Sequence, residues 1–489
     1  MNAVVKPNLL WSSPYRTLPF RFARLAGTNG RVLVSSEAGE FAILDNDDFK
    51  RLTACETLPD QTADNLEAIQ IIERGDNKLA IRLLATKLRT RKSFLRGGPS
   101  LHIFVVTLRC DHSCSYCQVS RQIEGASHFD MSAETAEAAV DRLFESPSRE
   151  LTVEFQGGEP LLAFPRIRQI VELIETKNAN RRVTFTITTT LHHLSDEILE
   201  YMRDKRFQVS TSLDGPAALH NANRPLPSRN SHDLTVAGIE RTRNALGAES
   251  LSALTTLSAT SLEYPEAIID EYVRLGFRTV FLRPISRFGF AAKAEKRLGY
   301  QAEKFLRFYE RALDYILSLN QQGVRISEVY ASLLLRSILT PFPTTYVDLR
   351  SPVGAGFGTF VYNYEGGVYA SDEGRMLAEM GDNALRLGSV HDKYQDLVNS
   401  EAMQLLAGSG FAESLPGCSD CAFVHYCGPD PAGSLSAFKD PVGHRAFSEH
   451  CKRHTGLFHI LFRKLSDGDE NTTRILNEWA FGRSAGEGL

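Results

Sequence analysis

Short apolar runs alternate with amphipathic segments through the middle of the chain. Apolar and β-branched residues cluster in six runs that predict strands, at Leu101–Leu108, Leu151–Phe155, Val183–Thr189, Phe207–Leu213, Leu251–Leu257 and Thr279–Arg283. Stretches with helical period lie between them, including residues 132–146, 195–206 and 265–276. The first stretch carries an apolar face made of Ala136, Ala139, Val140, Leu143 and Phe144. Ser195 is placed to cap the second stretch.

This alternation predicts a particular α/β fold. Strands that alternate with helices form parallel sheets joined by right-handed crossovers. Six repeats fall short of the eight that close a full barrel. We therefore expect a partial (β/α)6 barrel over residues 96–340, and a doubly wound sheet is the alternative.

The two ends of the chain have different patterns. Residues 30–46 predict two strands around a turn at residues 37–39, and a helix follows, so residues 1–95 are expected to form a small α/β domain. From about Val347 the alternation stops and glycine becomes frequent. Residues 341–460 contain four of the cysteines and are expected to form a separate domain, with a helical tail over residues 461–489.

Composition narrows the class of protein. The chain has 489 residues, 43% of them hydrophobic and 23% charged, which is typical of a globular protein of several domains. A net charge of −4 argues against nucleic-acid binding, and we interpret the basic run Thr86–Arg96 as a solvated helix end or linker. No apolar stretch reaches the roughly 18 residues of a membrane span, and the first twenty residues lack a signal-peptide core. We therefore expect a cytoplasmic protein with reduced thiols and no membrane partner.

Three of the eight cysteines lie together directly after the first predicted strand. Cys110, Cys114 and Cys117 have the spacing C-x3-C-x2-C, at the end of the sheet where ligands collect in parallel folds. Thiolates favour iron–sulfur clusters, zinc and copper(I). Three thiolates on a four-iron cluster leave one iron free for a substrate or cofactor. A structural zinc site completed by His112 or a distant ligand is the alternative.

The stretch "CDHSCSYC", with Tyr116 before its last cysteine, resembles the signature of the radical S-adenosylmethionine (radical SAM) superfamily. The resemblance is strengthened by "QGGEPLL" after the second strand, which is similar to the GGEP stretch of that family. It implies a [4Fe–4S] cluster on the three cysteines, with SAM bound to the open iron. It also implies that the methionyl ammonium of SAM is received by the GGEP residues, here Gly157, Gly158, Glu159 and Pro160.

Further motifs follow the later strands. "STSLDGP" resembles the SxDG stretch near the SAM ribose and carboxylate, which implies roles for Ser212 and Asp214. Arg224 resembles an arginine that contacts the SAM carboxylate, with a surface ion pair as the alternative. Thr188 ends the third strand where many relatives have Thr-Asn-Gly, and the asparagine is absent here. The resemblance implies that an external electron donor drives cleavage of SAM to a 5′-deoxyadenosyl radical, which abstracts hydrogen from the substrate.

The second group of cysteines is large enough to close a site. Cys418, Cys421, Cys427 and Cys451 resemble the SPASM domain of peptide-modifying radical SAM enzymes, which implies one auxiliary [4Fe–4S] cluster. A second auxiliary cluster is not expected, because its ligand positions hold Val353, Ser371 and Pro431. Structural zinc with His425 as a ligand is the alternative. Cys55 is left over and is expected to be buried.

Two roles are implied by these resemblances alone. In some SPASM relatives an aspartate at the position of Asp372 takes a proton in the active site, and a solvated loop aspartate is the alternative interpretation. The N-terminal domain resembles, in pattern, the winged-helix leader-recognition element of peptide maturases, which binds a leader peptide as an added strand. A domain that only adds stability is the alternative there.

A longer resemblance covers most of the chain. "FLRGGPSLHIFVVTLRCDHSCSYCQVSRQ", "GAGFGTFVYNYEGGVYASDE" and "RMLAEMGDNALRLG" look like the B-type radical SAM maturase family (HxsB) of the His-Xaa-Ser system. It implies a precursor with His-Xaa-Ser repeats, modified by cross-linking, and as partners a paralogous radical SAM maturase and a small accessory protein. The alternatives are a radical SAM enzyme acting on a small molecule and a non-catalytic, cluster-bearing partner of a paralogous maturase.

Overall fold

A nine-stranded sheet forms the centre of the protein. The computed structural model describes residues 13–75, 79–342, 344 and 346–482. In spatial order the strands are β12 (Leu282–Pro284), β10 (Leu251–Leu257), β9 (Gln208–Ser212), β8 (Arg182–Thr189), β7 (Glu150–Gly157), β6 (Leu101–Thr107), β14 (Thr359–Tyr362), β15 (Gly367–Tyr369) and β16 (Arg386–Ser389). Neighbours from β12 to β14 are parallel, and β14, β15 and β16 are antiparallel. The six parallel strands β6 to β12 confirm the predicted α/β partial barrel.

Amphipathic helices cover the outside of these strands. They are α4 (Ala133–Glu145), α5 (Phe164–Lys177), α6 (Asp196–Asp204), α7 (Ala217–Asn223), α8 (Ser231–Leu246) and α9 (Pro265–Arg274). The apolar face of α4 is buried as predicted, and Ser195 caps α6 by accepting a hydrogen bond from the Ile198 amide. The last predicted strand is divided, because β11 (Thr279–Val280) leaves the sheet to pair with β13 (Ser327–Glu328). None of the helices described is both long and apolar enough to cross a membrane.

The sheet continues beyond the predicted boundary at residue 340. β14 lies parallel to β6, so the segment that follows the barrel in sequence extends the same sheet. Four helices of this segment follow, α14 (Asp372–Glu379), α15 (Tyr394–Val398), α16 (Glu401–Ser409) and α17 (Pro431–Phe438). The predicted boundary at residue 460 falls inside α18 (Glu449–Asp467), which packs with α19 (Glu470–Phe481) against α12 (Ala302–Gln321) and α13 (Val329–Leu339).

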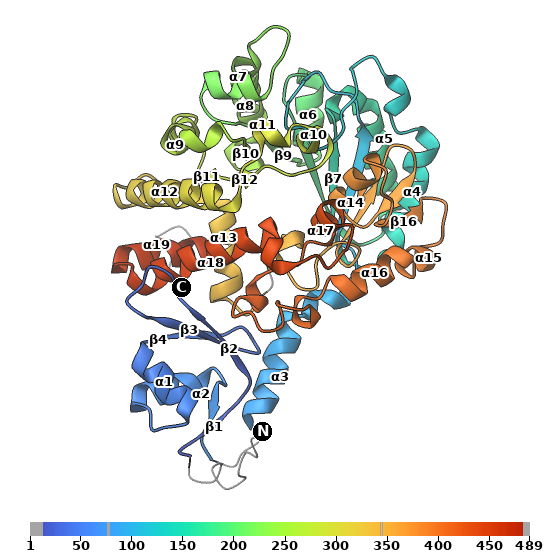
Figure 1. Ribbon diagram of the computed structural model, residues 1–489. Helices are drawn as coiled ribbons and strands as arrows, with labels where there is room; N and C mark the ends of the chain where they lie inside the picture. The colour runs from blue at the N-terminus through green and yellow to red at the C-terminus, as the bar shows by residue number, and fades with distance from the viewer. Residues whose placement is uncertain (1–12, 76–78, 343, 345, 483–489) are drawn as a thin grey trace.

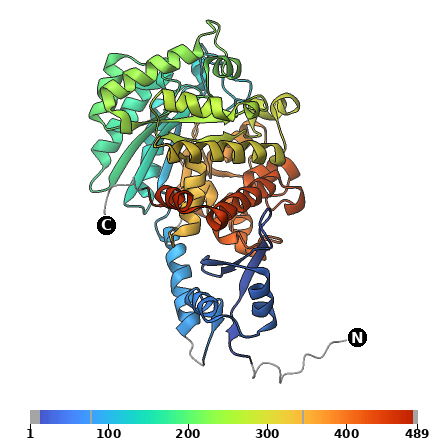
Figure 2. The ribbon, with the colours of Figure 1, turned by 90° about the vertical axis from the view of Figure 1, so that its left-hand side faces the viewer.

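The N-terminal domain stands apart from the barrel. Its elements are β1 (Arg16–Thr17), β2 (Phe20–Arg24), β3 (Val32–Ser36), β4 (Phe41–Leu44), α1 (Asn46–Ala54), α2 (Asp60–Ala68), β5 (Ile72–Glu73) and α3 (Leu79–Arg91). The predicted strands β3 and β4 pair, and β2 completes an antiparallel sheet in the order β2-β3-β4. Figures 1 and 2 show this domain at one end, with α3 leading to the barrel and the C-terminal helices between them. Cys55 is partly exposed rather than buried, because it caps α1 in a left-handed conformation.

The N-terminal domain contacts the second cysteine segment directly. The Ser35 hydroxyl donates to the carbonyl of Ala422 at 2.9 Å, and the Tyr426 hydroxyl donates to the carbonyl of Gly39 at 3.0 Å. Arg91 lies in the basic run that we expected to be solvated, yet it is buried and donates to the His425 carbonyl at 3.2 Å. This run therefore connects the N-terminal domain to the core of the protein.

Candidate active site

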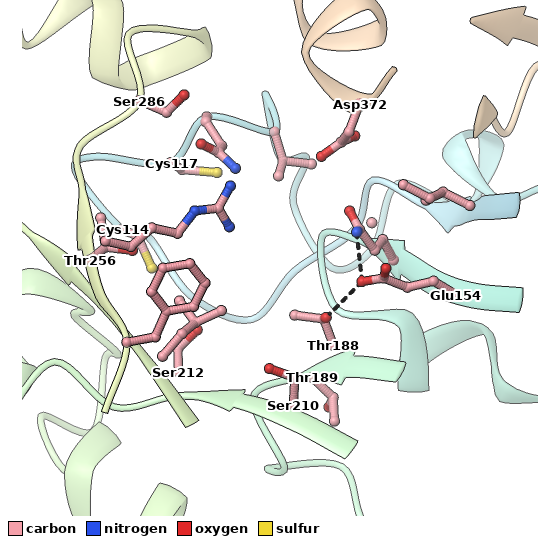
Figure 3. Close-up of a pocket in the computed structure, with 18 of the residues that line it drawn as sticks. Cys114, Cys117, Glu154, Thr188, Thr189, Ser210, Ser212, Thr256, Ser286 and Asp372 are labelled. Carbon is pink, nitrogen blue, oxygen red and sulfur yellow. Dashed lines mark hydrogen bonds between the residues drawn. The ribbon is translucent and has the colours of Figure 1, made fainter. Parts of the chain in front are cut away.

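The carboxyl ends of the parallel strands open into a cavity of about 520 Å³. Ten of the site residues predicted from the sequence line it: Cys110, Cys114, Cys117, Tyr116, Gly157, Gly158, Thr188, Ser212, Arg224 and Asp372. Figure 3 shows Cys114 and Cys117 on one side of this space and Glu154 and Asp372 on the other. The cavity thus joins residues of the barrel to a residue of the segment that follows it.

The three cysteines occupy the loop that follows β6. The loop is held by backbone hydrogen bonds from Cys117 to the Cys114 carbonyl at 3.2 Å and from Phe290 to the Cys117 carbonyl at 2.8 Å. Burial raises the pKa of the Cys114 thiol to about 12, and burial with the nearby Glu159 carboxylate raises the pKa of Cys110. Ionised thiols are therefore unfavourable here without a cation, and iron would supply the compensating charge.

The surroundings of these thiols fit an iron–sulfur cluster better than zinc. Among the described residues, the only group of three ligand atoms within 4.8 Å is Cys110, Asp111 and His112. Both ring nitrogens of His112 are engaged in hydrogen bonds, with Asp111 at 2.8 Å and with the Ser231 hydroxyl at 2.8 Å, so a metal would have to displace one of these partners. Tetrahedral zinc would need sulfurs about 3.8 Å apart. The wider spacing of the three thiols favours the larger cluster.

Gly157 and Gly158 bring the backbone of the β7 loop against the cysteine loop. A Cβ atom on Gly157 would lie 1.9 Å from the Thr107 carbonyl oxygen, and one on Gly158 would lie 2.2 Å from that of Arg109. Gly157 also has φ +149°, a conformation that other residues rarely adopt. The Gly158 amide donates to the Thr107 carbonyl at 2.9 Å. Glycine is required at both positions, and the backbone between them faces the cavity.

Glu159 and Pro160 are buried behind this loop and do not line the cavity. The Glu159 carboxylate accepts hydrogen bonds from the Thr189 hydroxyl at 2.7 Å, the Thr190 amide at 2.7 Å and the Leu161 amide at 3.0 Å. Both carboxylate oxygens of Glu159 thus already accept hydrogen bonds from the end of β8 and from the short helix that begins at Pro160. This geometry favours the backbone of residues 157 and 158, rather than the carboxylate, as the contact for an ammonium group.

Tyr116, Asp214 and Arg224 form one connected group. The Tyr116 hydroxyl donates to the fully buried Asp214 carboxylate, whose other oxygen lies 3.4 Å from Arg224 Nε. The guanidinium carbon of Arg224 lies 5.5 Å from the centre of the Tyr116 ring. Asp214 itself does not line the cavity, so its place is to orient Tyr116 and Arg224 beside Cys114.

The interior of the barrel is polar where it meets the cavity. Residues at alternating positions of neighbouring strands point inward: Glu154, Gln156, Thr188, Ser210, Ser212 and Thr256. Glu154 accepts hydrogen bonds from Gln156 at 2.7 Å and from the Thr188 hydroxyl at 3.2 Å. Burial, and then the charge of Asp372, raises the pKa of Glu154. We did not predict Glu154, although a charged residue on the inner face of a buried strand was the signal for it.

Asp372 begins α14 and belongs to a group of charged residues. Arg375 Nε donates to its carboxylate at 3.0 Å. The cavity wall beside it also holds Asp348, Glu373 and Arg283, none of which we predicted from the sequence. Burial raises the pKa of Glu373, and the charges of Asp348 and Asp372 raise it further. Their positions could not be foreseen, because these residues come from three segments that only the fold brings together.

The four C-terminal cysteines lie near one another. Burial raises the pKa of Cys427 well above its usual value, and the neighbouring thiols of Cys421, Cys418 and Cys451 raise it further. The Nε2 atom of His425 lies 3.4 Å from Arg21 and 4.0 Å from Glu37, so this ring nitrogen faces the N-terminal domain. No three of these thiols lie within 4.8 Å of one another in the described part of the chain, which again favours a cluster larger than zinc.

The positions expected to lack cluster ligands also converge. Val353, Ser371 and Pro431 come from distant segments, and all three line a second cavity of about 460 Å³. The three positions named from the resemblance therefore lie at one cavity. None of the three side chains offers a thiolate.

Comparison with known proteins identifies the domain that carries this cavity. The family model of the radical SAM superfamily matches residues 104–272, from β6 to α9. The chain contains a radical SAM domain. The three-cysteine loop, Gly157 and Gly158, Ser212 and Arg224 all lie within that match. A domain of this superfamily implies SAM and a [4Fe–4S] cluster as cofactors, and the thiols and the glycine backbone at the cavity fit them.

Curated relatives match parts of the chain. An uncharacterized protein of Methanocaldococcus jannaschii is 31% identical over 113 residues, which are 23% of this chain and 38% of that protein. The cysteine-type anaerobic sulfatase-maturating enzyme of Clostridium perfringens is 28% identical over 130 residues, which are 26% of this chain and 35% of that enzyme. The chain thus spans well under half of the length of these two relatives.

Two solved structures share the fold over more of the chain. Native anSMEcpe with bound AdoMet has a TM-score of 0.62 at 18% identity, covering 78% of this chain and 99% of that one. Streptococcus suis SuiB bound to the precursor peptide SuiA has a TM-score of 0.52 at 14% identity, covering 89% of this chain and 99% of that one. At these identities the likeness establishes the fold, and it extends beyond the radical SAM domain.

Proposed function

We propose that this protein is a radical SAM peptide maturase with one SAM-binding cluster and one auxiliary [4Fe–4S] cluster. The observation that carries the proposal is that Cys110, Cys114 and Cys117 share a single cavity with the Gly157–Gly158 backbone and with Asp372. When bound, SAM and the cluster supply reductive cleavage of SAM and hydrogen abstraction from the substrate. The residues of the chain supply position and exclude water.

Each part of the cavity has a role in this proposal. Cys110, Cys114 and Cys117 would hold the cluster and would leave one iron for SAM. The backbone around Gly157 and Gly158 would receive the ammonium group of SAM, and Arg224 would pair with its carboxylate. Thr188 and Ser212, at strand ends on the same cavity, would contact its ribose. Asp372, on the opposite wall, holds or accepts the proton released from the substrate.

A polypeptide substrate is favoured by the N-terminal domain. In the described residues β2 and β4 each pair only with β3, so both edges of the sheet are open to an added strand. The salt bridge from Lys87 to Glu40 places α3 beside the start of β4. Leu83, one helical turn before Lys87, is 42% exposed. An extended leader peptide can pair with β4 and place apolar side chains on this helix.

The finer assignment is the His-Xaa-Ser system. We propose a cytoplasmic enzyme that cross-links His-Xaa-Ser repeats of a ribosomally made precursor. In this proposal it works with an external electron donor, a small accessory protein and a paralogous radical SAM maturase, and without nucleic acid or a membrane. The support is the resemblance over residues 94–122, 354–373 and 375–388.

The test is anaerobic co-expression with such a precursor, with and without the paralogous maturase, followed by mass spectrometry. A loss of two hydrogens per repeat supports a cross-link. Reconstituted protein that cleaves SAM but leaves the precursor unchanged in mass and stereochemistry, with the paralogue present, would remove the His-Xaa-Ser assignment. Failure to cleave SAM when reduced would favour the alternative of a non-catalytic, cluster-bearing partner.

A further inference from the structure

The cysteine-lined cavity adjoins the second cavity. The two share a wall that includes Arg283, Tyr346, Asp348, Ser371 and Glu373. The far side of the second cavity is formed by residues that neighbour Cys427 and Cys451 in sequence, among them Pro429, Asp430 and His450. The second cavity therefore lies between the two groups of cysteines.

The outer rim of the second cavity is apolar and exposed. Met380 is 43% exposed, Phe438 is 37% exposed and Phe447 is 69% exposed, and all three line the cavity. Large apolar side chains that gather at the mouth of a cavity indicate a surface that is covered when a ligand binds. Their spread over α14, α17 and the segment before α18 suits an extended chain rather than a small molecule.

The inner end of the second cavity carries an excess of negative charge. Four carboxylates gather at the shared wall and beside it, from Glu154, Asp348, Asp372 and Glu373. Arg283 faces them, and Arg375 is paired with Asp372. Burial, and then the neighbouring carboxylates, raise the pKa of Asp348 and of Glu373, while Arg283 lowers both and Arg350 lowers that of Asp348. A further cation at this wall would be stabilised by both carboxylates.

We propose that the second cavity is the channel through which the substrate polypeptide reaches the active site, with Asp348 and Glu373 binding a cationic side chain next to the residue that reacts. The apolar rim of Met380, Phe438 and Phe447 contacts the substrate side chains that remain outside the channel. The space is open because Val353, Ser371 and Pro431 cannot hold a cluster. The inference rests on the proposed function in one respect, which is that the substrate is a polypeptide.

Selection from an mRNA-displayed library of random peptides tests the inference. The library is bound anaerobically to the reconstituted protein with SAM, and the retained peptides are sequenced. Lys or Arg should be enriched about tenfold over Gln and Met at one position, since charge-assisted pairing in a dry site is stronger than pairing between neutral groups. The double variant Asp348→Asn/Glu373→Gln, which keeps both side-chain shapes, should lose this preference.

Two further variants locate the site. Glu379 is an exposed carboxylate of α14, the helix that also carries Glu373, and it lines neither cavity. The variant Glu379→Gln should therefore keep the preference for Lys or Arg. Ala437→Trp narrows the mouth of the second cavity from the exposed side of α17 and should reduce peptide retention several-fold. The inference is overturned if the wild-type protein shows no cationic preference, or if the preference survives in the double variant.

Cleavage of SAM without peptide is measured on the same preparations. Release of 5′-deoxyadenosine by the double variant is measured against the wild type, because Asp348 and Glu373 line the cysteine-lined cavity as well as the second cavity. Glu379→Gln, which lines neither cavity, should release it at the wild-type rate. A wild-type protein that cleaves SAM but selects no cationic residue refutes the channel and leaves the proposed function standing. A protein that selects cationic peptides but does not cleave SAM refutes the proposed function and leaves the binding site standing.

Discussion

Single glycines decide how close the two loops at the SAM site come. Gly158→Ala would place a Cβ atom 2.2 Å from the Arg109 carbonyl and 2.5 Å from that of Leu108, and neither backbone group can move without shifting the cysteine loop. Overpacking of this kind costs about 1–3 kcal/mol. We therefore expect SAM affinity to fall by about tenfold or more, measured by equilibrium binding to the reconstituted protein.

Gly125→Ala is the matched control for this prediction. Gly125 lies in the segment between the cysteine loop and α4, and it lacks a positive φ. A Cβ atom added there would meet no other atom within 4 Å. This variant should bind SAM as the wild type does. Equal SAM affinity in both variants would show that the close approach of residue 158 is not needed.

A second residue-scale prediction concerns Glu159. In Glu159→Gln one carboxylate oxygen becomes an NH2 group that faces the donors at Thr189, Thr190 or Leu161. A buried donor left without an acceptor costs about 1–3 kcal/mol. The urea midpoint of the cluster-free protein should fall accordingly, whereas Glu137→Gln, on the exposed face of α4, should leave it unchanged. If the Glu159→Gln protein is as stable as the wild type but no longer binds SAM, the Glu159 carboxylate contacts the SAM ammonium group directly.

Residue identity was predictable where a local motif carried it. The seven cysteines, Gly157 and Arg224 were predicted as site residues because short spacings and their place after strands signal chemistry, and five of them, Cys110, Cys114, Cys117, Gly157 and Arg224, line one cavity. Asp214 and Glu159 were also predicted, as SAM contacts, but they lie outside the cavity lining and hold other residues. Glu373 meets Asp348 only through the fold, so no sequence spacing could reveal that pair.

At the scale of elements, the two cysteine segments form separate sites. The first is the loop after β6, and the second runs from the segment before α17 into α18. Removing one ligand from each should therefore separate the clusters. Cys114→Ala should lower the iron content from about eight to about four per chain and abolish SAM cleavage, while the auxiliary cluster stays.

Cys421→Ala is the counterpart on the other segment. It should also lose about four irons per chain, yet keep the signal of the cluster that responds to SAM. Iron analysis and electron paramagnetic resonance of the reduced protein, with and without SAM, read out both variants. If Cys114→Ala and Cys421→Ala both lose the same cluster, the two cysteine segments do not hold independent clusters.

Hydrophobic periodicity predicted the individual strands and helices better than it predicted how they are arranged. The apolar runs that predict β6 to β10 lie within two residues of the observed strands, because buried parallel strands have a strong local signal. β2 was missed, since its sequence FRFAR alternates over only five residues. The pairing of β14 with β6 was also missed, because long-range pairing leaves no mark on local sequence.

At the scale of the whole molecule, the N-terminal domain rests on the auxiliary-cluster segment. Arg91 joins three parts of the chain, since it donates to the carbonyls of Ser337 at 3.1 Å, His425 at 3.2 Å and Thr340 at 3.3 Å. If the N-terminal domain binds a leader peptide as proposed, Arg91 connects that domain to the segment that carries Cys418, Cys421 and Cys427. We therefore propose that this segment couples leader binding to the barrel.

Arg91→Met tests this link. Methionine fills similar space but leaves three buried carbonyls without a donor, which costs on the order of 3 kcal/mol. We expect faster hydrogen exchange in residues 418–427 and in β2 to β4, with partial loss of auxiliary iron and an intact SAM-responsive cluster. Arg89→Met, two residues earlier on the exposed side of α3, should change neither quantity. If the amides of residues 418–427 exchange as slowly in Arg91→Met as in the wild type, Arg91 does not couple the N-terminal domain to the auxiliary site. Other contacts, such as that of Ser35 with Ala422, would then have to account for any response to a bound leader.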